Sequence, residues 1–410
     1  MQDYDVLIVG GGHAGAQTAV ALRQRGYEGS VAIVCEEAAP PYERPPLSKE
    51  YLSGDRSADD ILIRPPAFWA QAGIDLHTGR RAVAVEADAR RVTLGDGATV
   101  GYRHLVWAAG GAPRRLTCAG HALAGVHSVR TREDVDRMRA ELASVDRVVV
   151  IGGGYIGLEA AAALAKAGKR VTVVEALPRV LARVAGEILS RFYEAEHRAH
   201  GVEVRLDTAV ECIEGSGGRA AGVRLHGGEL LPCEMVIVGI GIVPAVRPLR
   251  DAGAGGDNGV DVDEHCRTDL PGVFAIGDCA AHVNRYAGGA RVRLESVQNA
   301  NDQAAVVAHA LTGSPKPYDA VPWFWSFQYD LRLQTVGLST GHDEVVVRGE
   351  VASRRFSLVY LKEGRIVALD CVNTVKDFAQ GKALILRDDI PREVLADSSR
   401  PLKQAVPAAV

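Results

Sequence analysis

Cysteine is scarce in this chain and is not arranged for redox or metal chemistry. The 410 residues include seven cysteines, an odd number, and none of them forms a CxxC pair. Their spacing matches neither a disulfide framework nor a metal site. We therefore expect reduced thiols, most of them buried as small apolar side chains, and no bound metal. The seven are Cys35, Cys118, Cys212, Cys233, Cys266, Cys279 and Cys371.

The chain also lacks a strong charge imbalance and long apolar runs. Its formal net charge is -4, which gives no support for a nucleic-acid partner. No apolar run approaches the roughly 18 residues that a membrane-spanning helix needs. Met1 to Asp3 lead directly into an apolar segment without a signal peptide. We expect a soluble, cytoplasmic protein, a monomer or weak dimer, without a membrane or nucleic-acid partner.

What the chain does contain is the same glycine-rich turn twice, in VLIVGGGHAGAQTA and VVVIGGGYIGLEAA. Each turn follows a β-branched run and precedes an Ala-rich segment that is typical of a helix. The first glycine permits a tight turn, the second lets the backbone approach a pyrophosphate, and the third lets helix and strand pack closely. The glycines are Gly10, Gly12 and Gly15 in the first turn and Gly152, Gly154 and Gly157 in the second.

An acidic residue completes each turn about twenty residues later. A second apolar strand is expected in VAIVCEE, which ends at Glu36, and in VTVVEA, which ends at Glu175. A carboxylate in this place accepts hydrogen bonds from the ribose hydroxyls of an adenosine. The alternative is two glycine-rich turns in ordinary α/β units with solvated acids. The repetition favours two dinucleotide sites in one protein.

A third motif, GVFAIGDCA, indicates how the domains are arranged. A buried strand ends there at Gly277 and Asp278, and the carboxylate of Asp278 is suited to a polyhydroxyl chain such as ribityl. This strand would complete the sheet of the first unit. We predict an α/β protein with two Rossmann-like domains, the second inserted in the first, and a C-terminal α+β domain. The first domain is expected to comprise 1–110 with 242–321, the inserted domain 111–241 and the C-terminal domain 322–410. The side chains of the tail PLKQAVPAAV are expected to stay unburied.

Several longer motifs resemble the two-dinucleotide flavoprotein reductases. They are RPPLSK (44–49), WAAGGAPR (107–114), FAIGDCA (274–280) and PWFWS (322–326). Within that group the chain is most similar to the oxygenase-coupled, NADH-dependent ferredoxin reductases of the putidaredoxin reductase type, up to about Asp389. The resemblance implies that the discontinuous first domain binds FAD, that the inserted domain binds NAD(H), and that the last domain helps to form a partner surface.

RPPLSK is expected to be rigid, because each proline fixes its own backbone angle and restricts the residue before it. The loop would hold the Lys49 ammonium in a defined place, where it could stabilise negative charge on a reduced flavin. Glu159 lies in the first turn of the second helix. We predict a Lys49–Glu159 ion pair at the junction of the two cofactors, as the resemblance also implies. The alternative is a solvated lysine and a first-turn acid favoured by the helix dipole.

The remaining candidates come from the motifs and the resemblance. The catalytic candidates are Lys49, Glu159 and Trp325. The FAD candidates are Gly10, Gly12, Ala14, Gly15, Glu36, Arg44, Lys49, Val83, Ala109, Arg114, Asp278, Val297 and Trp325. The NAD candidates are Gly152, Gly154, Tyr155, Ile156, Gly157, Glu175, Gly239, Ile240, Gly241 and Glu295. The resemblance implies that Tyr155 covers the flavin until nicotinamide displaces it; simple helix packing is the alternative.

Glu175 is expected to decide between the two nicotinamide nucleotides. A carboxylate at this strand end repels the 2′-phosphate of NADPH, and its neighbour Ala176 adds no positive charge. We therefore predict a preference for NADH. Arg179 and Arg183, a few residues later, leave NADPH open as an alternative.

The electron acceptor is indicated partly by missing residues. Disulfide reductases of this group have reactive cysteines shortly after the first unit, but this chain has none between Cys35 and Cys118. We expect one-electron transfer to a docked two-iron ferredoxin that supplies a monooxygenase or dioxygenase. The resemblance implies that Trp325 lies between flavin and partner; the alternative for both Trp323 and Trp325 is plain interdomain core. Phe327 stands where the family has an acidic residue. Candidates for a basic docking patch are Arg291, Arg293, Arg332 and Lys376.

Two other functions stay open at this point. One is reduction of a small acceptor such as a quinone or dioxygen. The other is a flavoprotein that resembles apoptosis-inducing factor, although the basic face and targeting segment of such proteins are not evident here.

Overall fold

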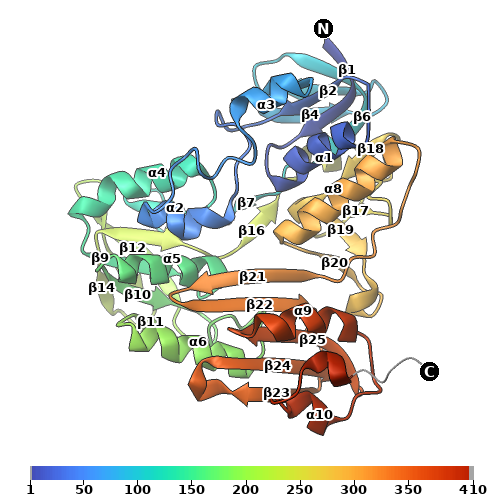
Figure 1. The fold of residues 1–410 in the computed structure, drawn as a ribbon. Helices are drawn as coiled ribbons and strands as arrows, with labels where there is room; N and C mark the ends of the chain where they lie inside the picture. Colours follow the sequence, from blue (N-terminus) through green and yellow to red (C-terminus); the bar gives the residue numbers. More distant parts are fainter. Residues whose placement is uncertain (1, 406–410) are drawn as a thin grey trace. The chain divides into compact units, whose positions relative to one another are not determined.

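The computed structural model describes residues 2–405, and it divides into two compact units (Figure 1). The first unit comprises Met1–Arg44, Ala58–Ala112 and Val243–Pro322. The second comprises Pro45–Ser57, Pro113–Ile242 and Trp323–Val410. The segment with Lys49 and the C-terminal segment therefore group with the second glycine-rich turn. Among the described residues, no helix is long and apolar enough to cross a membrane.

The first unit is built on a seven-stranded sheet with the order β3-β2-β1-β6-β5-β4, in which β18 also pairs with β6. Strands β1, β2, β3, β6 and β18 run parallel, whereas β4 and β5 form an antiparallel extension. The strand after the second glycine-rich unit thus completes the first sheet, as predicted. The strands are β1 Gln2–Val9, β2 Val31–Val34, β3 Ile74–His77, β4 Ala82–Glu86, β5 Arg91–Leu94, β6 Thr99–Trp107 and β18 Val273–Ala275.

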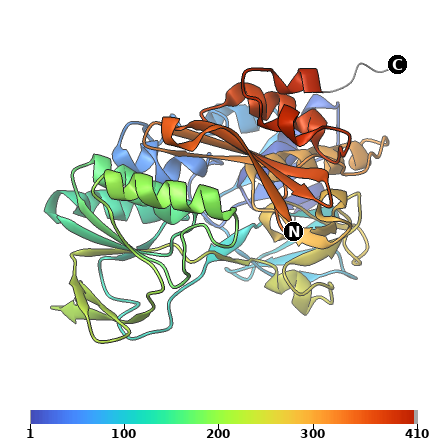
Figure 2. The same ribbon diagram turned by 90° about the horizontal axis from the view of Figure 1, so that it is seen from below.

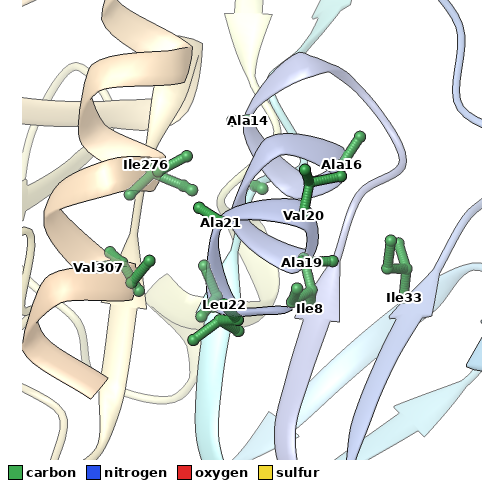
Figure 3. Close-up of a cluster of buried hydrophobic side chains, with 14 of the residues drawn as sticks. Ile8, Ala14, Ala16, Ala19, Val20, Ala21, Leu22, Ile33, Ile276 and Val307 are labelled. Atoms are coloured by element: carbon green, nitrogen blue, oxygen red, sulfur yellow. The ribbon is translucent and has the colours of Figure 1, made fainter. Parts of the chain in front are cut away.

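Helix α1 (His13–Gln24) is the centre of the first core. Ile8 of β1 and Ile33 of β2 lie on one side of α1, and Val307 of α8 (Val297–Leu311) lies on the other (Figure 3). All three side chains are fully buried. Alanines along α1 allow helix and sheet to approach closely. Burial of each large apolar side chain contributes about 1.5–3 kcal/mol, so this core fixes the start of α1 over the sheet.

The remaining elements of the first unit are short. They are α3 Pro66–Gln71, α7 Arg247–Asp251, the 3-10 helices η3 Gly277–Cys279 and η4 Arg285–Ala287, and a three-stranded sheet of β17 Val260–Val262, β19 Ala280–Val283 and β20 Arg291–Arg293.

The second unit repeats the parallel arrangement in a five-stranded sheet, β11-β10-β9-β15-β8. Its strands are β8 Val126–Ser128, β9 Arg147–Ile151, β10 Arg170–Val174, β11 Glu203–Arg205 and β15 Met235–Val238. Its helices are η1 Pro45–Ser48, α2 Glu50–Ser53, α4 Arg132–Glu141, η2 Leu142–Ser144, α5 Tyr155–Lys166 and α6 Glu187–Ala199. A second sheet contains β12 Val210–Ser216, β13 Arg219–Leu225 and β14 Leu230–Pro232. The short strands β7 Gly111–Pro113 and β16 Ile242–Pro244 pair with each other where the chain passes between the two units.

The C-terminal segment forms an antiparallel sheet, β21-β22-β25-β24-β23, with α9 and α10 beside it (Figure 2). The sequence predicts an α+β domain here, and the structure has five strands in its sheet. The hairpin β21–β22 was missed because its turn, Tyr329-Asp330, contains no glycine, proline or asparagine. The elements are β21 Trp323–Gln328, β22 Leu331–Gly337, β23 Glu344–Glu350, η5 Val351–Ser353, β24 Arg355–Lys362, β25 Arg365–Val372, α9 Val375–Gly381, η6 Lys382–Leu384, α10 Arg392–Ala396 and η7 Leu402–Ala405.

The prediction that the tail buries nothing is wrong for its first residues. Leu402 is only 1% exposed. The buried guanidinium of Arg348 holds the preceding segment by donating to the backbone carbonyls of Leu395 and Asp397, at 3.2 and 2.5 Å. A third bond, to the Arg400 carbonyl, continues this attachment. Residues 406–410 lie outside the described part.

Candidate active site

The first glycine-rich turn has the three steric features of a dinucleotide site. Gly10 has φ +115°, and a Cβ there would lie 2.2 Å from the Ala108 carbonyl oxygen. A Cβ on Gly15 would lie 1.9 Å from the Gly10 oxygen, so helix and strand touch at this point. In contrast, the nearest atom to a Cβ added at Gly12 would be Arg44 Nε, at 3.8 Å. The open position is the one where a pyrophosphate approaches backbone at the start of α1.

The second turn has the same geometry. Gly152 has φ +106°, and a Cβ there would lie 2.4 Å from the Gly239 oxygen. A Cβ on Gly157 would lie 2.2 Å from the Gly152 oxygen. A Cβ on Gly154 would lie 4.0 Å from its nearest atom, the Gly239 oxygen. β9 lies between β10 and β15, as β1 lies between β2 and β6. Ligands of open α/β sheets bind at such switch points, so each unit has the steric features of one dinucleotide site.

Arg44 and Asp278 lie beside the first turn. Besides its place above Gly12, Arg44 donates from Nη2 to Glu37 Oε1 at 2.7 Å. Burial lowers the pKa of Arg44, but the nearby Tyr42, Glu37 and Asp278 have the larger effect, so the pKa of Arg44 is raised. The open turn therefore has a fixed positive charge and a carboxylate close by. This combination fits the pyrophosphate and ribityl parts of FAD.

The motif that contains Asp278 packs directly on α1. A Cβ on Gly277 would lie 3.1 Å from the Cβ of Ala14, and the Gly277 amide donates to Gln303 Oε1 at 2.7 Å. A Cβ on Gly10 would lie 3.0 Å from Ala109 Cα. Val297, another predicted FAD residue, is the first residue of α8. The structure thus brings Ala14, Ala109 and Asp278 to the first turn.

Three other predicted cofactor residues are not among those that these contacts bring to the glycine-rich turns. Glu36 is exposed and lies 3.6 Å from Arg81, while its neighbour Glu37 pairs with Arg44. Val83 is 45% exposed in β4. Glu295 is exposed in the first unit and pairs with Arg293 at 2.7 Å. Their cofactor contacts stay predictions.

Arg114 belongs to the second unit rather than the first. Its backbone amide donates to the Gly241 carbonyl at 2.9 Å, and its side chain is exposed. The contact of Arg114 with FAD stays a prediction. The same bond fixes the loop that contains Gly239, Ile240 and Gly241 after β15.

Lys49 has the partner that the sequence predicts. It follows η1, in which the prolines of RPPLSK form a 3-10 turn, and it precedes α2. Lys49 Nζ lies 2.6 Å from Glu159 Oε2, and it also donates to the Pro45 carbonyl at 2.9 Å. The side chains of Lys49 and Glu159 are 12% and 6% exposed. A solvated lysine and a solvated helix acid are thereby excluded.

Two serines complete the environment of Glu159. Ser48 Oγ donates to Glu159 Oε2 and Ser326 Oγ donates to Oε1, each at 2.6 Å. A buried carboxylate is stable only when its oxygens are paired and hydrogen-bonded, and these three donors meet that condition. Both serines belong to motifs that the sequence analysis singled out, RPPLSK and PWFWS. Their hydroxyl chemistry was overlooked, because serine gives no periodic signal and Ser326 is distant in sequence.

Glu175 closes the second turn. Its Oε2 accepts from the Gly153 amide at 2.7 Å and its Oε1 from the Leu177 amide at 2.9 Å. Arg179 points into its own loop, where it donates to the Ala185 carbonyl at 2.7 Å and to Ser190. Glu175 is therefore fixed at the strand end, and Arg179 is already engaged with protein atoms. Arg183 is exposed.

Tyr155 and Ile156 begin α5 beside the second turn. The Tyr155 ring packs edge-to-face on Phe324 of β21, with centroids 4.9 Å apart. Among residues 2–405, the Tyr155 hydroxyl has no hydrogen-bond partner. Ile156 is 46% exposed. The packing on Phe324 is what the helix-packing alternative expects, and a role of Tyr155 over the flavin stays a prediction.

Aromatic side chains alternate along β21. Trp323, Trp325 and Phe327 occupy alternate positions and therefore one face, with Trp323 and Trp325 centroids 5.6 Å apart. Lys382 lies over the Trp323 ring at 4.6 Å, and Arg332 lies over the Phe327 ring at 5.9 Å. In place of the family's acid, this position therefore has an exposed aromatic ring beside a cation.

The other predicted docking cations differ in availability. Arg293 is 8% exposed, pairs with Glu295 and donates to the Asp278 carbonyl at 2.6 Å, so it fixes the loop at Asp278 and is not available to a partner protein. Arg291 lies 3.5 Å from Asp261. Lys376 is exposed in the first turn of α9. Arg332 and Lys376 remain the stronger candidates.

Thiol chemistry finds no support near the first turn. Cys35 is buried beneath Gly11, where an added Cβ would lie 2.4 Å from its Sγ. Burial, with the nearby Glu37, raises the pKa of Cys35 to about 12. A thiol that stays protonated is a poor nucleophile. The cysteines of the described residues are free thiols.

Comparison with known proteins agrees with the duplicated turns and the C-terminal sheet. Residues 4–304 match the pyridine nucleotide-disulphide oxidoreductase family, and residues 323–406 match the reductase C-terminal family. The 5,5'-dehydrodivanillate O-demethylase ferredoxin reductase subunit of Sphingobium sp. is 58% identical over all of both chains. A ferredoxin–NAD(P)(+) reductase of Sphingomonas sp. is 56% identical over 98% of this chain and 97% of its own.

A solved structure shows the same architecture. The reductase in the covalent putidaredoxin reductase–putidaredoxin complex superposes with a TM-score of 0.94 and 40% identity over 98% of each chain. The two chains therefore share the same fold over nearly their whole length. The chain belongs to the pyridine nucleotide-disulphide oxidoreductase family and, within it, to the ferredoxin reductases.

Proposed function

We propose that this protein transfers electrons from NADH, through FAD, to a two-iron ferredoxin. The carrying observation is the buried Lys49–Glu159 ion pair in the unit that also contains the second glycine-rich turn and Trp325. The named relatives, which are ferredoxin reductases, support the same acceptor. One relative serves an O-demethylase, which supports an oxygenase-type enzyme as the final recipient.

FAD would be held in the first unit. Gly12 leaves room for its pyrophosphate, Arg44 would offset the phosphate charge, and the Asp278 carboxylate would accept from the ribityl hydroxyls. When bound, FAD accepts two electrons from NADH and releases them one at a time. The proposed division is FAD in 1–110 with 242–321, NAD in 111–241, and a partner surface in 322–410.

NADH would be held at the second turn. Gly154 leaves backbone accessible to the pyrophosphate, and Glu175 is placed for the adenosine ribose. A 2′-phosphate would bring two negative charges to this carboxylate, and Arg179 is turned into its own loop. The arrangement supports NADH over NADPH.

Lys49 would act through charge. Because Glu159 holds it in one orientation, the ammonium is preorganised and needs no solvent rearrangement when negative charge develops nearby. The family resemblance implies that this charge would develop on the flavin. Glu159 in turn is kept in place by Ser48 and Ser326.

The acceptor is assigned to a protein rather than to a thiol substrate. Cys35 is buried and protonated, whereas the aromatic face of β21 and the cations Arg332 and Lys376 suit an acidic protein partner. The cytoplasm is the proposed compartment.

Ferredoxin-dependent reduction of cytochrome c tests the proposal. With NADH and FAD-loaded protein, we expect cytochrome c reduction to require an added two-iron ferredoxin. Equal rates with and without ferredoxin, or faster turnover with a quinone or dioxygen, would instead support the small-acceptor alternative.

A further inference from the structure

A buried hydrogen-bond chain extends from Glu159 on the side opposite Lys49. Ser326 Oγ lies 2.6 Å from Glu159 Oε1, and Gln328 Nε2 lies 3.2 Å from Ser326 Oγ. Gln328 Oε1 then lies 2.8 Å from His197 Nε2, and His197 Nδ1 lies 3.0 Å from the Tyr329 hydroxyl. Ser326, Gln328 and His197 are at most 1% exposed. These groups are shielded from bulk solvent, so each bond depends on the next.

The direction of every bond follows from Glu159. An ionised carboxylate only accepts, so Ser326 must donate its single hydroxyl proton to Glu159. Ser326 then accepts from the amide nitrogen of Gln328, which leaves the Gln328 oxygen facing His197. The imidazole must therefore be protonated at Nε2 and must accept at Nδ1 from the Tyr329 phenol. All donors in the chain point toward Glu159.

The opposite polarity would remove a bond from Glu159. If His197 were protonated at Nδ1 instead, Gln328 would donate to its Nε2 and present its oxygen to Ser326. Ser326 would then donate to Gln328, and its lone pairs would face Glu159 Oε1 at 2.6 Å. An ionised Glu159 excludes that arrangement. The tautomer of His197 and the charge of Glu159 are thus linked through two intervening side chains.

Other features hold the far end of the chain in the required state. Burial lowers the pKa of His197 to about 4, so the ring is neutral near pH 7. Burial, with the nearby Glu196, raises the pKa of Tyr329, so the phenol keeps its proton. Tyr329 also has φ +56°, an unfavourable backbone conformation for an aromatic residue, and its ring stacks on His200 with centroids 3.7 Å apart. Such strain persists where the surrounding contacts determine the conformation.

We propose that His197 is a positioning residue: its Nε2–H tautomer orients Gln328 and Ser326 so that Glu159, and through it Lys49, is held ready for flavin reduction. This inference rests on the proposed function. His197 touches neither Glu159 nor Lys49, and it lies in α6, outside all the motifs that the sequence displays.

The test compares two substitutions at one position. His197→Gln can place an amide nitrogen where Nε2 was, so it preserves the donor to Gln328, whereas His197→Leu removes it. At saturating NADH, we expect flavin reduction in His197→Leu to be roughly tenfold slower, with the NADH Kd unchanged, because one hydrogen bond to a charged group loses its orientation. His197→Gln is expected to restore the rate to within about twofold. His226→Leu, at an exposed histidine, serves as the control.

A second pair of measurements does not depend on turnover. In the wild-type holoprotein, the 15N chemical shifts of His197 should report the Nε2–H tautomer; the Nδ1–H tautomer would overturn the inference. Ser326→Ala should slow flavin reduction as His197→Leu does, and the double variant should be no slower than either, since both act on the same bond. Full additivity, or an unchanged rate in a folded His197→Leu, would also overturn it.

Failure of the proposed function would look different. If the wild-type protein did not reduce its flavin with NADH, or if Lys49→Met did so at the wild-type rate, the role of the ion pair would be wrong. The tautomer of His197 would still be measurable in that case.

Discussion

Lys49 Nζ and Glu159 Oε2 lie 2.6 Å apart although 110 residues separate them in the chain. Both side chains are almost fully buried, so neither charge can be removed without leaving the other uncompensated. Pro45 and Pro46 restrict the loop before Lys49, and the start of α5 fixes Glu159. The pair is therefore preorganised by the fold.

Replacing Lys49 by methionine removes the positive charge but keeps a long side chain in its place. We expect flavin reduction by NADH to slow by about 100-fold, because a preorganised charge is lost. The free energy of unfolding should fall by about 3 kcal/mol, because Glu159 stays buried without its cation. Stopped-flow absorbance and urea denaturation measure the two effects. Lys166→Met, at an exposed position of α5, the helix that contains Glu159, should change neither the reduction rate nor the stability. An unchanged reduction rate in Lys49→Met would contradict the assignment.

Glu175→Gln should relax the choice of nucleotide. The substitution removes the charge but keeps an oxygen that can accept from the Gly153 amide. We expect the ratio of kcat/KM for NADPH to that for NADH to rise by roughly tenfold. Glu187→Gln, at an exposed acid of the same unit, is the control. Equal kcat/KM for the two nucleotides in the wild-type protein would show that Glu175 does not discriminate.

Asp278→Asn should weaken FAD binding. A neutral amide accepts more weakly from hydroxyls than a carboxylate does, so we expect roughly tenfold weaker FAD affinity. The flavin content after gel filtration and the Kd of the apoprotein both report this change. Asp257→Asn, at an exposed loop position of the first unit, should retain FAD. Full retention in Asp278→Asn would remove Asp278 from the FAD site.

Charge reversal at Arg332 and Lys376 should weaken ferredoxin binding. Both side chains are exposed, and the backbone amide of Arg332 donates to Asn373 Oδ1 at 2.9 Å, three residues before Lys376. For Arg332→Glu with Lys376→Glu, we expect the KM for ferredoxin to rise by about tenfold and its salt dependence to shrink. Flavin reduction by NADH should stay unchanged. Arg355→Glu, on the separate strand β24, is the matched control; a similar KM effect there would indicate a nonspecific charge response.

His197 should make stability depend on pH in the acid range. Its pKa is lowered from 6.5 to about 4, so the unfolded chain takes up a proton first as the pH falls. Stability is therefore lost from about pH 6.5 downward, by about 2 kcal/mol at pH 5. His197→Gln should lose correspondingly less between pH 7 and 5 in urea denaturation. His226→Gln, at an exposed site, should follow the wild-type curve; parallel curves for all three proteins would show that His197 does not titrate as stated.

The parts of the site that were predictable from sequence lie in continuous motifs. Gly10 and Gly152, the helices that follow them and the late strand of the first sheet could be predicted, because turn geometry and hydrophobic periodicity are local properties. Lys49 could be paired with Glu159 because each belongs to a motif of specific composition. The extra hairpin β21–β22 could not be predicted, because its turn depends on Tyr329 in an unfavourable conformation that tertiary contacts hold.

The sequence by itself determined the two dinucleotide turns, the acid at Glu175, the absence of a reactive cysteine pair and the family resemblance. Tertiary structure alone decided that Glu37 rather than Glu36 pairs with Arg44, that Arg293 is tied to the Asp278 loop, and that Ser48 and Ser326 complete the Glu159 site. The physical reason is that a backbone turn is specified by neighbouring residues. A buried hydrogen-bond network is specified by side chains that only folding brings within about 3 Å of one another.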